Sequence, residues 1–181
     1  RFATLLPDAR FIDLPGVSDR LRAVKSPAEI ALISEAASIA DKAMTAIAAR
    51  ARPGLSPRAA AAIAAACFLE NGADTGETGP IVPGVGDHEF LHGVMTTQPL
   101  AAGDILHVEL IPKRRNYSAR LMRPVLIGED RRELSATAER LVALQDRQFA
   151  AMRPGALARD VDAILREAVL SEGLRPAYDN V

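Results

Sequence analysis

The segment Arg52-Pro53-Gly54 recurs 101 residues later as Arg153-Pro154-Gly155, and this repeat is the clearest indication of how the chain folds. A glycine ends the apolar pattern that follows each copy, Gly72 in the first and Gly173 in the second. The apolar positions between these marks also correspond: Ala60, Ile63 and Phe68 in the first copy, and Val161, Ile164 and Val169 in the second. The repeat predicts two related halves of helices and strands, the alternative being a chance match of two Pro-Gly turns between helices.

Helix start and stop signals flank both copies of the repeat. Ser26-Pro27-Ala28-Glu29 combines a capping serine, a proline at the first helical position and a glutamate three residues after the cap, which predicts a helix from about residue 27 to 50. Ser56-Pro57 opens a second helix that Asn71-Gly72 closes. A third amphipathic helix, over about residues 135–152, precedes the second copy.

A β-hairpin is expected between the two copies. Gly103-Asp104 leads into an apolar strand over residues 105–111, and a turn over residues 112–116 follows. A return strand over residues 117–127 ends at Gly128, which predicts an antiparallel pair.

The first 24 residues do not have the pattern of a domain. Apolar and polar residues alternate over Arg10–Leu14, which predicts a short strand, and Pro15 and Gly16 then begin a charged stretch. We interpret residues 1–24 as a linker.

Composition excludes several classes of protein. The chain has 181 residues with 22 basic and 23 acidic side chains, so it lacks the electrostatic pattern of a protein that binds nucleic acid or a membrane surface. A single cysteine, Cys67, excludes an internal disulfide framework. No apolar run approaches the roughly 18 residues that span a bilayer, and the predicted location is cytoplasmic.

Two of the three histidines lie in a glycine-rich loop between Gly86 and Gly93. Exposed imidazoles in loops often serve binding or proton transfer, which makes His88 and His92 candidate site residues. They are four residues apart, but the flanking glycines disfavour the helix that a pair of metal ligands at this spacing requires. The alternative is that each histidine only satisfies local hydrogen bonds.

The first hairpin strand has one polar and one apolar face. His107 and Glu109 are two residues apart and are expected to project to the same side. The return strand carries Arg120, which makes Glu109 with Arg120 a candidate cross-strand ion pair. The alternative, a solvated polar face, is disfavoured because a sheet packed between helices has little solvent to face and buried charges are costly without partners. Leu106, Val108 and Leu110 are expected to project to the opposite, apolar side of this strand.

Taken together, these motifs resemble the superfamily of creatinase, prolidase (Xaa-Pro dipeptidase), aminopeptidase P and methionine aminopeptidase. The resemblance is carried by Val24–Ile30, His92, Gly103-Asp104 and Asn116–Gly128, in their order and spacing. It implies an α+β pita-bread fold made of two pseudo-symmetric α-plus-antiparallel-β halves, and a homodimer.

The resemblance also implies how the chain divides. Residues 1–24 would be a linker from a preceding N-terminal domain, and residues 25–181 would be the first two-thirds of the catalytic domain. The repeat halves would run over about 27–128 and from 129–181 onward.

The functional residues of the family transfer only in part. The substrate-contacting histidine falls on His92, which we predict to be catalytic. The first metal-ligand aspartate falls on Glu109, but the second falls on Arg120, and a guanidinium cannot ligate a divalent ion. The resemblance therefore implies a pocket with neither metal ligands nor a cofactor. The catalytic glutamate of creatinase falls on Met122. The predicted substrate-binding residues are Glu109, Arg120, His88 and His107.

On this basis the sequence predicts a hydrolase that cleaves a C–N bond of a small amide or amidino metabolite without metal, with His92 moving the proton. One alternative is a metal-dependent Xaa-Pro dipeptidase or aminopeptidase, for which a divalent metal would be the cofactor. A second alternative is a catalytically inactive pita-bread module that binds another protein. The first two would take a small molecule or a dipeptide as substrate.

Overall fold

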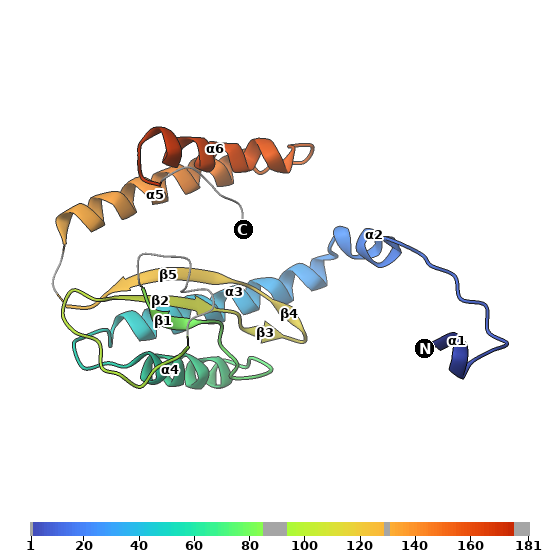
Figure 1. Ribbon diagram of the computed structural model, residues 1–181, viewed down its shortest axis with the longest axis horizontal. Helices are drawn as coiled ribbons and strands as arrows, with labels where there is room; N and C mark the ends of the chain where they lie inside the picture. The colour runs from blue at the N-terminus through green and yellow to red at the C-terminus, as the bar shows by residue number, and fades with distance from the viewer. Residues whose placement is uncertain (1, 85–93, 129–130, 176–181) are drawn as a thin grey trace. The chain divides into compact units, whose positions relative to one another are not determined.

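The computed structural model describes residues 2–84, 94–128 and 131–175 (Figure 1). The chain divides into two compact units, Arg1–Ile127 and Gly128–Val181. The first unit holds α1 (Phe2–Leu5), α2 (Val17–Ala23), α3 (Pro27–Ala48), α4 (Pro57–Glu70) and strands β1 (Ile81–Pro83), β2 (Ile105–Leu110), β3 (Lys113–Arg114), β4 (Tyr117–Ser118) and β5 (Leu121–Leu126). The second unit holds α5 (Arg132–Ala151) and α6 (Ala158–Ser171).

The two long helices of the first unit begin where the capping signals predict. Ser26 Oγ accepts from the Glu29 N–H at 3.4 Å and the Ser26 N–H donates to Glu29 Oε2 at 2.6 Å, which completes a capping box at the start of α3. Ser56 Oγ accepts from the Ala59 N–H at the start of α4. The chain leaves α4 through Gly72, whose φ of 85° is readily adopted only by glycine.

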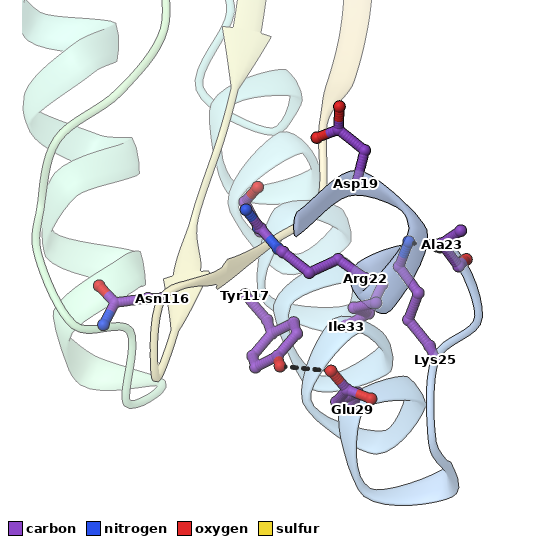
Figure 2. A pocket seen from close by; sticks show the side chains of 9 residues that line it. Asp19, Arg22, Ala23, Lys25, Glu29, Ile33, Asn116 and Tyr117 are labelled. Carbon is purple, nitrogen blue, oxygen red and sulfur yellow. Dashed lines mark hydrogen bonds between the residues drawn. The ribbon is translucent and has the colours of Figure 1, made fainter. Parts of the chain in front are cut away.

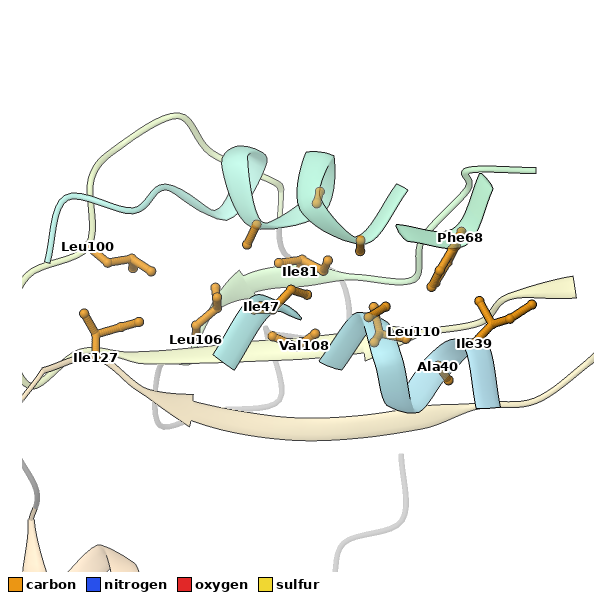
Figure 3. Packing of buried hydrophobic residues seen from close by; sticks show 14 residues of the cluster. Ile39, Ala40, Ile47, Phe68, Ile81, Leu100, Leu106, Val108, Leu110 and Ile127 are labelled. Carbon is orange, nitrogen blue, oxygen red and sulfur yellow. The ribbon is translucent and has the colours of Figure 1, made fainter. Parts of the chain in front are cut away.

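Strands β1, β2 and β5 form an antiparallel sheet in the order β1-β2-β5. Helices α3 and α4 pack on one face of it, and the core lies between (Figure 3). The largest fully buried side chains of this core are Ile47, Phe68, Ile81, Leu106, Leu110 and Ile127, with Val108 beside them. Since apolar burial contributes roughly 25 cal/mol per Å², this core stabilises the packing of α3 and α4 on the sheet.

The predicted hairpin forms, but its return strand is not continuous. The turn is made by Arg115 and Asn116, both with positive φ, and the Asp74 carboxylate accepts both of their N–H groups at 2.9 and 2.8 Å. The short β3–β4 pair then ends, and β5 begins only at Leu121. The single return strand predicted from residue 117 is wrong because Pro112, which follows β2, has no N–H to donate to a partner strand.

The predicted strand at Arg10–Leu14 is also wrong. These residues lie in neither a helix nor a strand, and the side chains of Phe11, Ile12 and Leu14 are exposed. A strand needs a neighbouring strand to pair with its backbone N–H and C=O groups. Within the described residues, no strand lies beside residues 10–14 to form these hydrogen bonds. The short helices α1 and α2 flank this segment instead.

The second unit is a pair of helices that contact each other. The guanidinium of Arg140 on α5 forms an ion pair with Glu172 after α6. Leu144, one turn after Arg140 on α5, is fully buried. Gly155 and Gly173 have positive φ, as do Gly54 and Gly72 at the same places of the first copy. Both copies of the repeated segment therefore form a helix, a Pro-Gly turn and a second helix. In the part of the chain that the structure describes, no helix is long and apolar enough to cross a bilayer.

Candidate functional site

The alternation of β2 separates the core from the candidate site. Leu106, Val108 and Leu110 are fully buried against α3 and α4, as the sequence predicts. His107 and Glu109 therefore project to the opposite face of the sheet. The register places Val82 and Pro124 beside His107, and Met122 beside Glu109.

The predicted ion pair between Glu109 and Arg120 forms on this face. Arg120 Nε donates to Glu109 Oε1 at 2.7 Å. Arg120 lies two residues before Met122, the partner of Glu109 in the ladder, so the guanidinium reaches its acceptor diagonally. The Glu109 side chain is 5% exposed and that of Arg120 is 57% exposed. A buried carboxylate is thus paired with a guanidinium at the surface.

The burial of Glu109 depends on a neighbouring segment that the sequence did not single out. The Glu109 N–H donates to the Pro80 carbonyl at 2.9 Å, so the chain before β1 runs directly beside it. A Cβ at Gly79 would lie 2.7 Å from Glu109 Cγ and 3.0 Å from its carbonyl oxygen. Only glycine allows this approach. The signal in the sequence that could have indicated this close approach is Gly79 directly before Pro80, just before β1 begins.

His107 lies next to the ion pair and is half-buried. Burial lowers the pKa of its imidazole, the positive charge of Arg120 lowers it further, and the negative charge of Glu109 opposes both effects. The net effect favours the neutral form of the imidazole. The hydrogen bond that Arg120 donates to Glu109, together with the charge of that carboxylate, raises the pKa of Arg120 above its ordinary value. The site thus presents one permanent cation, one paired anion and one neutral imidazole.

These residues do not fit a pair of divalent metal ions. Such ions are bound by the lone pairs of carboxylate or imidazole groups. Glu109 Oε1 already accepts a hydrogen bond from Arg120, and the protonated guanidinium of Arg120 has no lone pair that could bind a metal. Over residues 2–84, 94–128 and 131–175, no cluster of three or more His, Cys, Asp or Glu side chains is assembled that could hold a metal. The predicted loop histidines His88 and His92 lie outside the described residues, and their roles stay predictions.

A separate cavity of about 390 Å³ lies between α2, the start of α3 and the β3–β4 hairpin (Figure 2). Tyr117 Oη donates to Glu29 Oε1 at 2.7 Å inside it, and this bond, with those from Ser26, lowers the pKa of Glu29 to about 2. Both carboxylate oxygens of Glu29 are therefore engaged in holding the hairpin and the cap of α3. The lining residues are Asp19, Arg22, Ala23, Lys25, Glu29, Ile33, Asn116, Tyr117 and Ser118.

Comparison with known proteins identifies the family. Residues 31–181 match the model of metallopeptidase family M24. The chain belongs to this family. The sequence resemblance predicted the superfamily of creatinase, prolidase, aminopeptidase P and methionine aminopeptidase, and the family match confirms it.

The curated relatives of this M24 chain are named as peptidases. It is 26% identical over 172 residues to an uncharacterized peptidase, YqhT, of Bacillus subtilis, covering 95% of this chain and 49% of that protein. It is 27% identical over 163 residues to a Xaa-Pro dipeptidase of Pyrococcus furiosus, covering 90% of this chain and 47% of that protein. The chain thus spans about half the length of the curated relatives it matches.

Solved structures agree with the predicted fold. The prolidase of Pyrococcus furiosus superposes with a TM-score of 0.81 at 27% identity, over 90% of this chain and 48% of that one. The X-Pro aminopeptidase of Thermotoga maritima superposes with the same TM-score at 23% identity, over 96% of this chain and 49% of that one, and supports the fold alone. The M24 chain therefore holds part of an α+β pita-bread fold, as predicted.

Proposed function

We propose that the chain is part of a hydrolase that cleaves the C–N bond of a small, dipeptide-sized substrate. The observation that carries the proposal is the nearly buried Glu109 held by Arg120 on the sheet face that points away from the core. A buried carboxylate is costly to desolvate, and its pairing with an exposed guanidinium on this face favours a role in binding. Membership of the M24 family and the relatives named Xaa-Pro dipeptidases support the same class of reaction.

In this proposal, Arg120, Glu109, His107 and His88 bind or position the substrate, and His92 transfers a proton. Arg120 binds the substrate, Glu109 orients Arg120, and His107 offers a neutral imidazole as a hydrogen-bonding group beside them. His92 transfers the proton that the leaving nitrogen requires when water attacks the carbonyl carbon, a task that suits an imidazole with a pKa near neutrality. His88, four positions before His92 in the sequence, contacts the substrate. The assignment of His92 follows the resemblance, and that of His88 follows the glycine-rich sequence around it. The assignments of Glu109, Arg120 and His107 are based on their contacts on the sheet.

Two forms of the hydrolase differ in their need for metal. The Glu109–Arg120 pair supports the metal-independent form, since its residues do not fit a metal pair. The comparisons favour the alternative, a metal-dependent Xaa-Pro dipeptidase, because the relatives carry that name within a metallopeptidase family. A homodimer and a cytoplasmic location complete the proposal and rest on the resemblance and the composition.

The test is an assay of the full-length protein purified without added metal. A Xaa-Pro dipeptide and a panel of small amides are incubated with and without EDTA, amine and ammonia release are measured, and bound metal is quantified. Hydrolysis that persists in EDTA supports the metal-independent form. Dipeptide cleavage that requires Mn²⁺, Co²⁺ or Zn²⁺ and disappears with EDTA supports the alternative. Absence of turnover under all conditions contradicts the proposal and favours an inactive module that binds another protein.

A further inference from the structure

Within the described residues, the guanidinium of Arg120 forms a hydrogen bond through its Nε atom only. Its Nε donates to Glu109 Oε1 at 2.7 Å, and no other residue of the described part of the chain forms a hydrogen bond or ion pair with it. A guanidinium has five N–H donors, of which Nε carries one. Nη1 and Nη2 carry the other four, and two of these point outward along the edge between the two atoms. The side chain is 57% exposed, so this edge is accessible to a ligand.

The orientation of Arg120 is set before any ligand arrives. Glu109 is held by its N–H bond to Pro80 and has no room to move toward Gly79. The anchored carboxylate fixes the guanidinium through Nε, so part of the conformational entropy of the arginine is lost on folding and not on binding. Such preorganisation is typical of a recognition group.

The surroundings favour an anion as the ligand. Glu109 is the acidic partner of Arg120 and is almost fully shielded, whereas the guanidinium is the exposed charge of the pair. Val82 and Met122 lie on the same face, the first buried and the second half-buried, and an apolar surround strengthens charge-assisted bonds. The Nη1–Nη2 edge matches the two oxygens of a carboxylate in spacing and charge.

From this geometry we infer that the Nη1–Nη2 edge of Arg120 binds the carboxylate of the substrate, with Glu109 as the positioning residue. The substrate class is then dipeptides and N-acyl amino acids that carry a free carboxylate close to the bond that is cleaved. This inference rests on the proposed function. At a position where the resemblance expects a ligand for a divalent cation, the chain supplies a fixed cation of its own.

The test compares two pairs of probes on the full-length protein in EDTA: Ala-Pro with Ala-Pro amide, and N-acetylproline with its amide. Isothermal titration calorimetry measures their affinities. We expect each acid to bind at least tenfold more tightly than its amide, because a charge-assisted bidentate contact is lost in the amide. Equal affinity of acid and amide, or no binding of either acid, overturns the inference.

Variants assign the effect to Arg120. Arg120→Gln should abolish the preference for the acid, and Arg120→Lys should keep only part of it because an ammonium lacks the planar fork. Arg123→Gln is the matched control, since Arg123 pairs with Val108 on the other face of the sheet and its Nη1 donates to the Met122 carbonyl. If Arg120→Gln folds poorly with Glu109 unpaired, the double variant Glu109→Gln with Arg120→Gln replaces the ion pair by two amides and serves the same purpose. A preference for the acid that survives in the Arg120 variants contradicts the inference.

A hydrolysis assay on the same probes separates this inference from the proposed function. Turnover of acid and amide at equal rates overturns the inference and leaves the hydrolase standing. A tenfold preference for binding the acid, without turnover, supports the inference and overturns the hydrolase.

Discussion

Tyr117 on β4 donates a 2.7 Å hydrogen bond to Glu29 in the first turn of α3, joining two residues that are 88 positions apart (Figure 2). Glu29 also completes the capping box of α3 through its other carboxylate oxygen. One side chain therefore links the start of the helix to the tip of the hairpin that follows β2.

Removing the hydroxyl should loosen this link. We expect Tyr117→Phe to lower the melting temperature of the full-length protein by about a few degrees, because Glu29 loses its strongest neutral donor. Differential scanning calorimetry measures the change. Tyr178→Phe is the control, since it makes the same chemical change at the other tyrosine of the chain. An equal shift in both variants would show that the Tyr117–Glu29 bond contributes nothing specific.

The same contact should make stability depend on pH in the acid range. The pKa of Glu29 is lowered from 4.5 to about 2 in the folded chain, so its stabilising effect is present above pH 4.5. That effect is lost as the pH falls from about 4.5 to about 2, where the carboxylate becomes protonated. We expect the stability difference between wild type and Tyr117→Phe to shrink over this interval. Urea denaturation between pH 2.5 and 7 measures it, and a difference that is constant with pH would contradict the prediction.

Gly79→Ala should lower the stability of the fold by forcing the chain before β1 away from Glu109. The new Cβ would lie 2.7 Å from Glu109 Cγ and 3.0 Å from its carbonyl oxygen, so the chain before β1 must move. Overpacking of this kind costs about 1–3 kcal/mol. Gly76→Ala is the matched control, because its nearest neighbour, Ala65 Cβ, would be 3.3 Å away. Chemical denaturation compares the two, and a smaller loss in Gly79→Ala than in Gly76→Ala would refute the close packing on Glu109.

A double-mutant cycle measures the coupling between Glu109 and Arg120. Arg120→Ala leaves a carboxylate that is 5% exposed without its partner, which should cost about 1–3 kcal/mol, toward the lower value because Arg120 itself is 57% exposed. Glu109→Ala with Arg120→Ala should cost less than the two single changes added together. Denaturation of the four proteins gives the coupling energy. Additive losses would mean that the pair contributes no interaction to the folded state.

Local interactions explain what could be predicted from the sequence. The caps of α3 and α4 involve Ser26 with Glu29 and Ser56 with Ala59, which are neighbours within one turn. The two faces of β2 follow from simple alternation, so the core side and the Glu109 side were both assigned correctly. The ion pair with Arg120 follows from these faces once the hairpin is recognised.

Contacts between distant segments explain the remaining differences. The alternating residues Arg10–Leu14 form no strand because backbone pairing requires a neighbour that the local pattern cannot specify. The approach of Gly79 to Glu109 and the bond from Tyr117 to Glu29 depend on how the packed surfaces of the first unit meet. The amino-acid sequence alone thus determines the long helices α3, α4 and α5, the faces of β2 and the Glu109–Arg120 pairing, which arise from capping, periodicity and strand alternation. Burial of the carboxylate and exposure of the guanidinium arise only when the chain before β1 packs beside β2.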